Sequence, residues 1–223
     1  MWILTKIYFV RHCEAQGNVQ RIFQGTTDTD ISELGAKQLE CLKKRFKDIK
    51  LDKIYSSPLI RAVKTAEAVN GDKGLVIEKL RGLIELDGGI VEGKPFVEAF
   101  NSIPGLVDTW NNHPQDFAPQ YGEPMRHAYE RIYNTLRYVF ENNKGKTVAC
   151  TTHGGVTRCL LCRLLKGDIE QLKEIPWSDN TAVALLEIDD NFNVNIAFYN
   201  DASHLPEQLL PTRNRIVSYM KEE

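Results

Sequence analysis

The chain has 223 residues, which is enough for one large α/β domain or two small ones. Its hydrophobic content of 42% and charged content of 26% are ordinary for a globular protein and exclude a disordered chain. A net charge of −2, without any block of Lys or Arg, gives no electrostatic footprint for nucleic acid.

The sequence also shows no sign of a membrane or secreted protein. No window approaches the ~18 consecutive apolar residues that a membrane helix needs. The N-terminus is apolar, but no basic segment precedes it and no small-residue cleavage site follows. The five cysteines are an odd number in a chain without a signal peptide, so reduced thiols in a cytoplasmic protein are the simplest account.

The predicted elements begin with a strand over 6–11, after which the chain turns polar at Arg11-His12-Cys13-Glu14. Ser32 is a candidate N-cap for the first long helix. That helix has one apolar stripe at helical spacing, formed by Gly35, Leu39, Leu42 and Phe46. A strand over 53–56 follows the helix.

Strands and helices continue to alternate along the rest of the chain. Further helices are expected at 59–70, around Ala128, Ile132, Leu136 and Val139, and at 156–165. Further strands are expected at 75–79, 147–152, 182–188 and 194–199. The last two strands are joined by a short polar segment, which predicts a hairpin at the sheet edge.

This alternation predicts a three-layer α/β/α fold with a mostly parallel central sheet. The segment at about 88–122 differs, because it has no strand pattern and contains Pro95, Pro104, Pro114 and Pro119. We interpret it as a helical insertion over the active site within a single domain spanning 1–223. Its aromatic residues Phe96, Phe100 and Trp110 either form its own core or shape a pocket for the apolar part of a substrate.

Polar clusters follow three of the predicted strands, where open α/β sheets bind their ligands. Arg11 and His12 end the first strand, with Asn18 nearby; Arg61 follows the second; His153-Gly154-Gly155 follows the strand at 147–152. Each cluster alone has an ordinary explanation, such as a core histidine, a surface arginine or a tight turn. Together, two arginines, two histidines and backbone N–H groups at a helix start favour binding of a dianion such as phosphate.

Four ordered motifs carry a family resemblance: "FVRHCEAQGN", "YSSPLIRAVKTAE", "LIELDGGIVEG" and "TTHGGVTRCLL". With "NTAVALLEID" and "YNDASHL" as a closing segment, they resemble the histidine phosphatase (phosphoglycerate mutase-like) superfamily over nearly the whole chain. The one departure is Cys13, since the family's first motif reads Arg-His-Gly-Glu.

The resemblance implies a phosphoryl transfer through a phosphohistidine on His12. Arg11, Asn18, Arg61 and His153 are then expected to hold the phosphoryl oxygens, and Gly25 is counted with the substrate-binding residues. Glu85 matches the family's proton donor, while Glu92 and Glu78 are less favoured candidates for that acid. The expected ligands are a small phosphorylated metabolite and phosphate ion, with no cofactor and no metal.

Cysteine chemistry is the main alternative at this site. A cysteine-dependent phosphatase needs an arginine six residues after the nucleophile, and the residue six after Cys13 is Val19. Cys159 and Cys162 form a single C-x-x-C pair inside an apolar helix, which favours packing over a zinc or redox site. The spacing of His113, His127 and His204 is not that of metal ligands, and His204 is expected to be structural or to approach the pocket mouth.

Three functions remain open. A phosphatase is favoured over a bisphosphoglycerate-dependent mutase, because 86–120 contains only Lys94 as a basic residue besides His113 and a mutase needs a second phosphate clamp. The shorter insertion resembles the bacterial phosphatase branch. The third candidate, a non-catalytic phospho-ligand sensor, is favoured only by Cys13. Both a monomer and a homodimer are compatible with the sequence.

Overall fold

A computed structural model of the chain describes residues 4–210 and contains one six-stranded sheet in the order β3-β2-β4-β1-β5-β6. The β1–β4, β2–β4 and β2–β3 pairs are parallel, whereas β5 is antiparallel to both β1 and the edge strand β6. The α/β fold and the terminal hairpin are therefore confirmed. The strands are β1 Thr5–Arg11, β2 Lys53–Ser56, β3 Ile77–Lys79, β4 Thr147–Thr152, β5 Val183–Ile188 and β6 Val194–Asp201.

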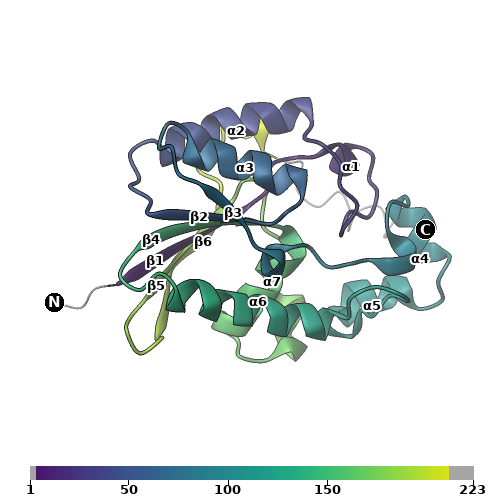
Figure 1. Cartoon of the computed structure of the whole chain (residues 1–223). Coiled ribbons are helices and arrows are strands. Elements are labelled where there is room, and N and C mark those ends of the chain that lie inside the picture. The colour runs from purple at the N-terminus through teal and green to yellow at the C-terminus, as the bar shows by residue number, and fades with distance from the viewer. Residues whose placement is uncertain (1–3, 211–223) are drawn as a thin grey trace.

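Helices cover both faces of the sheet (Figure 1). α2 (Glu33–Phe46) and α3 (Ile60–Asn70) pack on one face, and α6 (Met125–Glu141) and α7 (Gly154–Leu165) pack on the other. Because strand side chains alternate between faces, β1 contributes to both cores. Ile7 and Phe9 join the α6–α7 side, while Val10 packs with Leu42 and Phe46 of α2.

The predicted N-cap holds the start of α2, since Ser32 Oγ accepts a hydrogen bond from Gly35 N at 2.9 Å. A Cβ at Gly35 would lie 2.1 Å from Glu14 O, so a glycine is required where the helix crosses the loop after β1. The helix thereby fixes the loop that carries His12.

The third strand is shorter than predicted and begins at Ile77 rather than Leu75. The side chain of Asn70 explains the difference. Its Nδ2 donates to Leu75 O at 2.8 Å and its Oδ1 accepts from Leu75 N at 3.1 Å, so both backbone groups of Leu75 are bonded away from a strand partner.

The insertion is helical, as predicted, and lies beyond the carboxyl ends of the parallel strands together with the short α1 (Gln16–Val19) (Figure 1). It contains α4 (Phe96–Asn101) and α5 (Leu106–Asn112). Short 3₁₀ helices span Arg81–Leu83, Gly89–Val91, Pro114–Asp116, Ile169–Glu174 and Glu207–Leu209. Within residues 4–210 no helix is long and apolar enough to cross a membrane. Both ends of the predicted 1–223 domain lie outside the described residues.

Candidate active site

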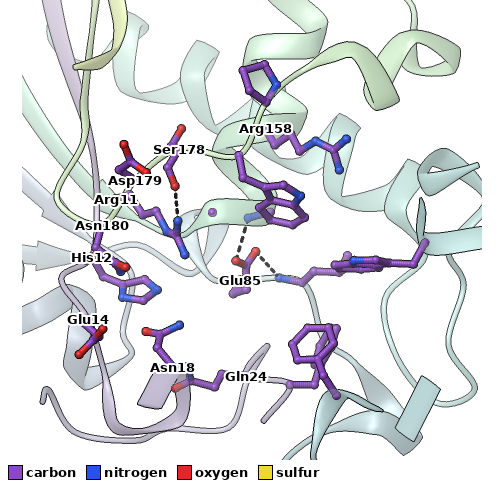
Figure 2. Close-up of a pocket in the computed structure, with 18 of the residues that line it drawn as sticks. Arg11, His12, Glu14, Asn18, Gln24, Glu85, Arg158, Ser178, Asp179 and Asn180 are labelled. Carbon is purple, nitrogen blue, oxygen red and sulfur yellow. Dashed lines mark hydrogen bonds between the residues drawn. The ribbon is translucent and has the colours of Figure 1, made fainter. Parts of the chain in front are cut away.

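The sheet order brings the three predicted polar clusters together. β4 lies between β2 and β1, and all three are parallel, so their carboxyl ends meet at one edge. At this edge the ring centroids of His12 and His153 are 5.1 Å apart. Figure 2 shows Arg11, His12, Asn18 and Glu85 around one pocket, which is also lined by residues of the insertion.

His12 is held as a neutral imidazole with a defined tautomer. Its Nδ1 lies 2.6 Å from Cys13 O, and only a protonated Nδ1 can donate to that carbonyl. The lone pair is therefore on Nε2. Burial, followed by the charges of Arg61 and Arg11, lowers the pKa of His12 well below 6.5. A neutral, oriented imidazole can act as a nucleophile.

The buried Arg61 and the partly buried Arg11 lie beside this histidine, and backbone carbonyls fix both guanidinium groups. Arg11 Nη1 donates to Ser178 O. Arg61 is 0% exposed, and its guanidinium donates to Thr27 O at 2.9 Å, Gly25 O at 2.8 Å and Gln24 O at 3.2 Å. Burial is the main factor that lowers the pKa of each arginine, but an arginine stays charged at neutral pH.

Three buried nitrogens in this cluster have no hydrogen-bond partner among the described residues: Arg11 Nε, Arg61 Nε and His153 Nδ1. His153 Nε2 is 2.7 Å from Ser57 Oγ, and when that hydroxyl donates to it, Nδ1 carries a proton. Buried donors without partners are costly, so their concentration in one place is typical of a ligand site. An anion with several oxygen acceptors matches this donor set.

Asn18 contributes a further donor. Its Oδ1 accepts from Ala15 N at 2.9 Å, which orients the side chain, and it lies next to His12 in the pocket (Figure 2).

Glu85 lies against the start of α7. Its carboxylate accepts from Gly155 N at 2.9 Å and Val156 N at 3.1 Å, and from Leu86 N at 2.9 Å. A Cβ on Gly155 would lie 2.7 Å from Glu85 Oε1, so the glycine permits this close approach. Glu85 lines the pocket opposite His12 and can exchange a proton with a bound ligand (Figure 2).

Neither alternative acid lines this pocket. Glu92 accepts five hydrogen bonds, from four backbone N–H groups and a hydroxyl in the segments at 25–27 and 88. It is therefore an anchor for the loop whose carbonyls hold Arg61. Glu78 is in the edge strand β3, where it pairs with Lys53 at 2.7 Å.

Gly25 has a structural role in the same loop. Its N–H bonds to Glu92 Oε2 at 3.2 Å, its carbonyl bonds to Arg61, and a Cβ would lie 1.9 Å from Leu86 O. Direct contact of Gly25 with a substrate remains a prediction.

The cysteines are poorly suited to nucleophilic chemistry. Cys13 is fully buried, its N–H donates to Thr65 Oγ1 at 3.2 Å, and burial raises the pKa of its thiol to about 12. A thiol with that pKa stays protonated at neutral pH. Cys159 and Cys162 are buried in α7 as predicted, with Cys159 Sγ 3.5 Å from Met125 Sδ.

His204 is structural and does not line the pocket. Its Nδ1 is 3.0 Å from Arg45 Nη1 and its Nε2 is 3.1 Å from Thr181 Oγ1. Burial and the charge of Arg45 lower its pKa to about 4. In the part of the chain that the structure describes, no cluster of three or more His, Cys, Asp or Glu side chains could hold a metal ion.

The sequence-based reasoning missed the contribution of the segment that precedes β5. Trp177, Ser178 and Asn180 line the pocket, and Asn180 Nδ2 donates to His12 O at 3.0 Å. The predicted terminal hairpin did not reveal it, because the segment reaches the pocket only through the antiparallel pairing of β5 with β1, which the sequence pattern does not show. The sequence-based reasoning also missed the pocket-lining side chain of Arg158.

The structure is an α/β fold with a mostly parallel sheet covered by helices, and its histidines and arginines gather at the carboxyl edge. Comparison of the sequence agrees: residues 7–201 match the histidine phosphatase superfamily (branch 1). The chain belongs to this superfamily.

Individual relatives cover almost the whole chain. Phosphoserine phosphatase 1 of Hydrogenobacter thermophilus is 31% identical over 207 residues, which are 92% of this chain and 96% of that protein. The structure of Bacillus stearothermophilus YhfR superposes with a TM-score of 0.84 at 31% identity, covering 90% of this chain and 98% of that chain. A phosphoserine phosphatase mutant from Entamoeba histolytica in complex with phosphoserine gives a TM-score of 0.78 at 25% identity, covering 91% and 100%.

Proposed function

We propose that this protein hydrolyses phosphomonoesters of small metabolites through a phosphohistidine intermediate on His12. The observation that carries the proposal is the group of unpartnered buried nitrogens of Arg11, Arg61 and His153 around a neutral imidazole. A phosphoryl group has three peripheral oxygens to accept from such donors while its phosphorus faces the nucleophile.

In the first half-reaction the lone pair of His12 Nε2 forms a bond to phosphorus. The bond from phosphorus to the ester oxygen breaks, and its electron pair remains on that oxygen. Glu85, in its protonated form, donates a proton to this oxygen and an alcohol leaves. Arg11, Arg61 and His153 stabilise the charge on the peripheral oxygens throughout.

In the second half-reaction water attacks the phosphohistidine. Glu85, now a carboxylate, accepts a proton from the water as its oxygen bonds to phosphorus. The phosphorus–nitrogen bond breaks and its electron pair returns to Nε2 of His12. The net reaction converts one ester and one water into an alcohol and phosphate, and it restores both side chains.

The relatives support a phosphatase. Proteins named as phosphoserine phosphatases occur among both the sequence relatives and the structural neighbours, and each spans nearly the whole of this chain. Others are named as phosphoglycerate mutases or mutase-like proteins.

One observation favours a mutase as the second candidate. Arg21, Arg158 and Lys173 line the pocket, and all three come from segments outside the insertion. Arg158 and Lys173 are already engaged, since Arg158 Nε donates to Ile175 O at 2.7 Å and Lys173 Nζ donates to Asn112 Oδ1 at 3.0 Å. The phosphatase therefore remains the preferred function.

The direct test is phosphate release from p-nitrophenyl phosphate and a panel of phosphorylated metabolites. We expect turnover by the wild-type protein, none by His12→Ala, and full turnover by His127→Ala, a matched change at an exposed histidine of α6. Binding of inorganic phosphate without any turnover would instead identify a sensor. Transfer between phosphoglycerates far faster than hydrolysis would identify a mutase.

A further inference from the structure

The pocket extends well beyond the residues that surround the phosphoryl group. Its volume is about 1070 Å³, which is slightly above the range of about 300–1,000 Å³ for sites that enclose drug-sized ligands. The small leaving group of phosphoserine would fill only a minor part of it. The remaining volume can therefore hold a leaving group larger than that of phosphoserine, and the side chains around it determine which leaving groups bind.

Four aromatic side chains line this pocket. Phe23, Phe96, Trp110 and Trp177 all line it, whereas Phe100 is fully buried in the insertion. Of the insertion's aromatic residues, Phe100 belongs to the core and the partly buried Phe96 lines the pocket. Trp110 does both, because it borders the pocket but is only 8% exposed and packs in the same core as Phe100. We call Phe23, Phe96, Trp110 and Trp177 the aromatic wall.

The aromatic wall begins where the phosphoryl site ends. A Cβ built on Gly154 would lie 3.2 Å from Arg11 Cζ and 3.4 Å from Trp177 Cε3, so one point contacts both the phosphoryl-binding guanidinium and the indole. Ser178, whose carbonyl accepts from Arg11, is the next residue after Trp177. Trp177 is therefore the ring of the aromatic wall that lies next to the Arg11 guanidinium.

The rings of the aromatic wall are held in place before any ligand binds. The ring centroids of Trp110 and Trp177 are 5.7 Å apart, those of Phe23 and Trp110 5.9 Å, and those of Phe96 and Trp110 6.1 Å. The guanidinium of Arg158 lies over Trp177 at 5.0 Å, and its Nε is fixed by Ile175 O at 2.7 Å. Pre-oriented rings select ligands at little entropic cost.

We infer that the aromatic wall selects phosphomonoesters whose leaving group carries an aromatic ring close to the ester oxygen. This inference rests on the proposed hydrolysis and names the substrate class for it. Aromatic pairs in edge-to-face or offset-stacked geometry attract each other beyond the effect of buried area, so an aryl group gains more from these rings than an aliphatic group of equal size. The alternative substrate is a phosphomonoester with a small anionic leaving group that pairs with Arg158 and Lys173.

The test compares benzyl phosphate with cyclohexylmethyl phosphate. Both are esters of primary alcohols with similar size and similar leaving-group chemistry, so their ratio of kcat/KM isolates the effect of the aromatic ring. We expect the wild-type protein to favour the benzyl ester by about threefold to tenfold. Trp177→Leu is expected to bring the ratio close to one, and Trp177→Phe, which keeps a ring, to retain most of it.

A binding measurement separates failure of this inference from failure of the proposed hydrolysis. Benzylphosphonate and cyclohexylmethylphosphonate are not hydrolysed, and their affinities measured by calorimetry should show the same preference and the same loss in Trp177→Leu. A wild-type ratio near one for both esters and phosphonates overturns the aromatic wall, as does a higher kcat/KM for phosphoserine than for benzyl phosphate. Absence of all turnover with the phosphonate preference intact overturns the hydrolysis and leaves the aromatic subsite.

Discussion

Replacing Glu85 and Glu92 separately with Gln distinguishes a proton donor from a loop anchor. The two residues are seven positions apart in the same segment, and either could supply a carboxyl group from sequence alone. In the structure Glu85 lines the pocket, whereas Glu92 bonds to the loop at 25–27. The same chemical change is therefore expected to produce two different kinetic signatures.

The magnitudes follow from what each carboxylate contacts. General acid catalysis contributes on the order of 10²- to 10⁴-fold, so Glu85→Gln should lose that factor on an alkyl phosphate, whose alcohol needs a proton to leave. The loss on p-nitrophenyl phosphate should be far smaller, because nitrophenolate leaves without one. In Glu92, Oε1 accepts from two backbone N–H groups and Oε2 from two more and a hydroxyl. In Glu92→Gln the amide nitrogen replaces one of these oxygens, and at either position it lies against at least two hydrogen-bond donors. We expect this to lower the unfolding free energy by roughly 3 kcal/mol.

The assay is kcat/KM of each variant on p-nitrophenyl phosphate and on benzyl phosphate, together with urea unfolding. Glu92→Gln should lower both activities by a similar factor, because the displaced loop moves Arg61, and should unfold at lower urea. Glu85→Gln should depress only the benzyl ester strongly. A selective loss on the benzyl ester in Glu92→Gln, with Glu85→Gln unchanged, would refute the assignment.

Three further predictions concern the site and its surroundings. Because burial, Arg61 and Arg11 lower the pKa of His12, the imidazole stays neutral as the pH falls through 6.5. In a pH–rate profile, kcat/KM should therefore begin to fall on the acid side only below pH 6.5. Arg61→Gln should move this fall to higher pH, whereas Arg61→Lys, which keeps the charge, should not. Cys13→Gly and Cys13→Ser should each keep kcat within about twofold of wild type, since a buried thiol with a pKa of about 12 is not the nucleophile; loss of turnover in both variants contradicts this. The pKa of His204 is lowered to about 4, so its contribution to stability is present above pH 6.5 and is lost as the pH falls toward 4. Urea unfolding should therefore show a smaller difference in unfolding free energy between wild type and His204→Asn at pH 5 than at pH 7.5. Because the side chain is partly exposed, we expect this difference to shrink by only about 1 kcal/mol.

The sequence was sufficient to predict the inner part of the site. Apolar runs locate the ends of β1 and β4, and parallel strands place those ends at one edge, so the sequence pattern alone groups Arg11, His12 and His153. Arg61 joined this group from its place after the second strand, and the family resemblance added Glu85. The prediction of these residues rests on local sequence patterns and on the general rule that α/β sheets bind ligands at the carboxyl ends of their strands.

The outer part of the site depends on contacts that periodicity does not reveal. Trp177 enters the pocket because β5 pairs antiparallel with β1, and strand order cannot be read from apolar spacing. Phe96 and Phe100 are four residues apart on α4, yet one lines the pocket and the other is buried. Their environments are decided by how the insertion packs on the sheet, which is a tertiary property. For the same reason the anchoring role of Glu92 was visible only from its hydrogen bonds.

The central claim is that phosphate passes through a covalent bond to His12, and trapping that intermediate tests it most directly. The protein is mixed with p-nitrophenyl phosphate, quenched within the first turnover in alkali, where phosphohistidine persists, and digested for mass spectrometry. We predict the added mass of one phosphoryl group on the peptide that contains His12. This added mass should be absent in His12→Ala and increased in Glu85→Gln, which is slow to activate water. Continued hydrolysis by His12→Ala, or a phosphoryl group on any residue other than His12, would contradict the account.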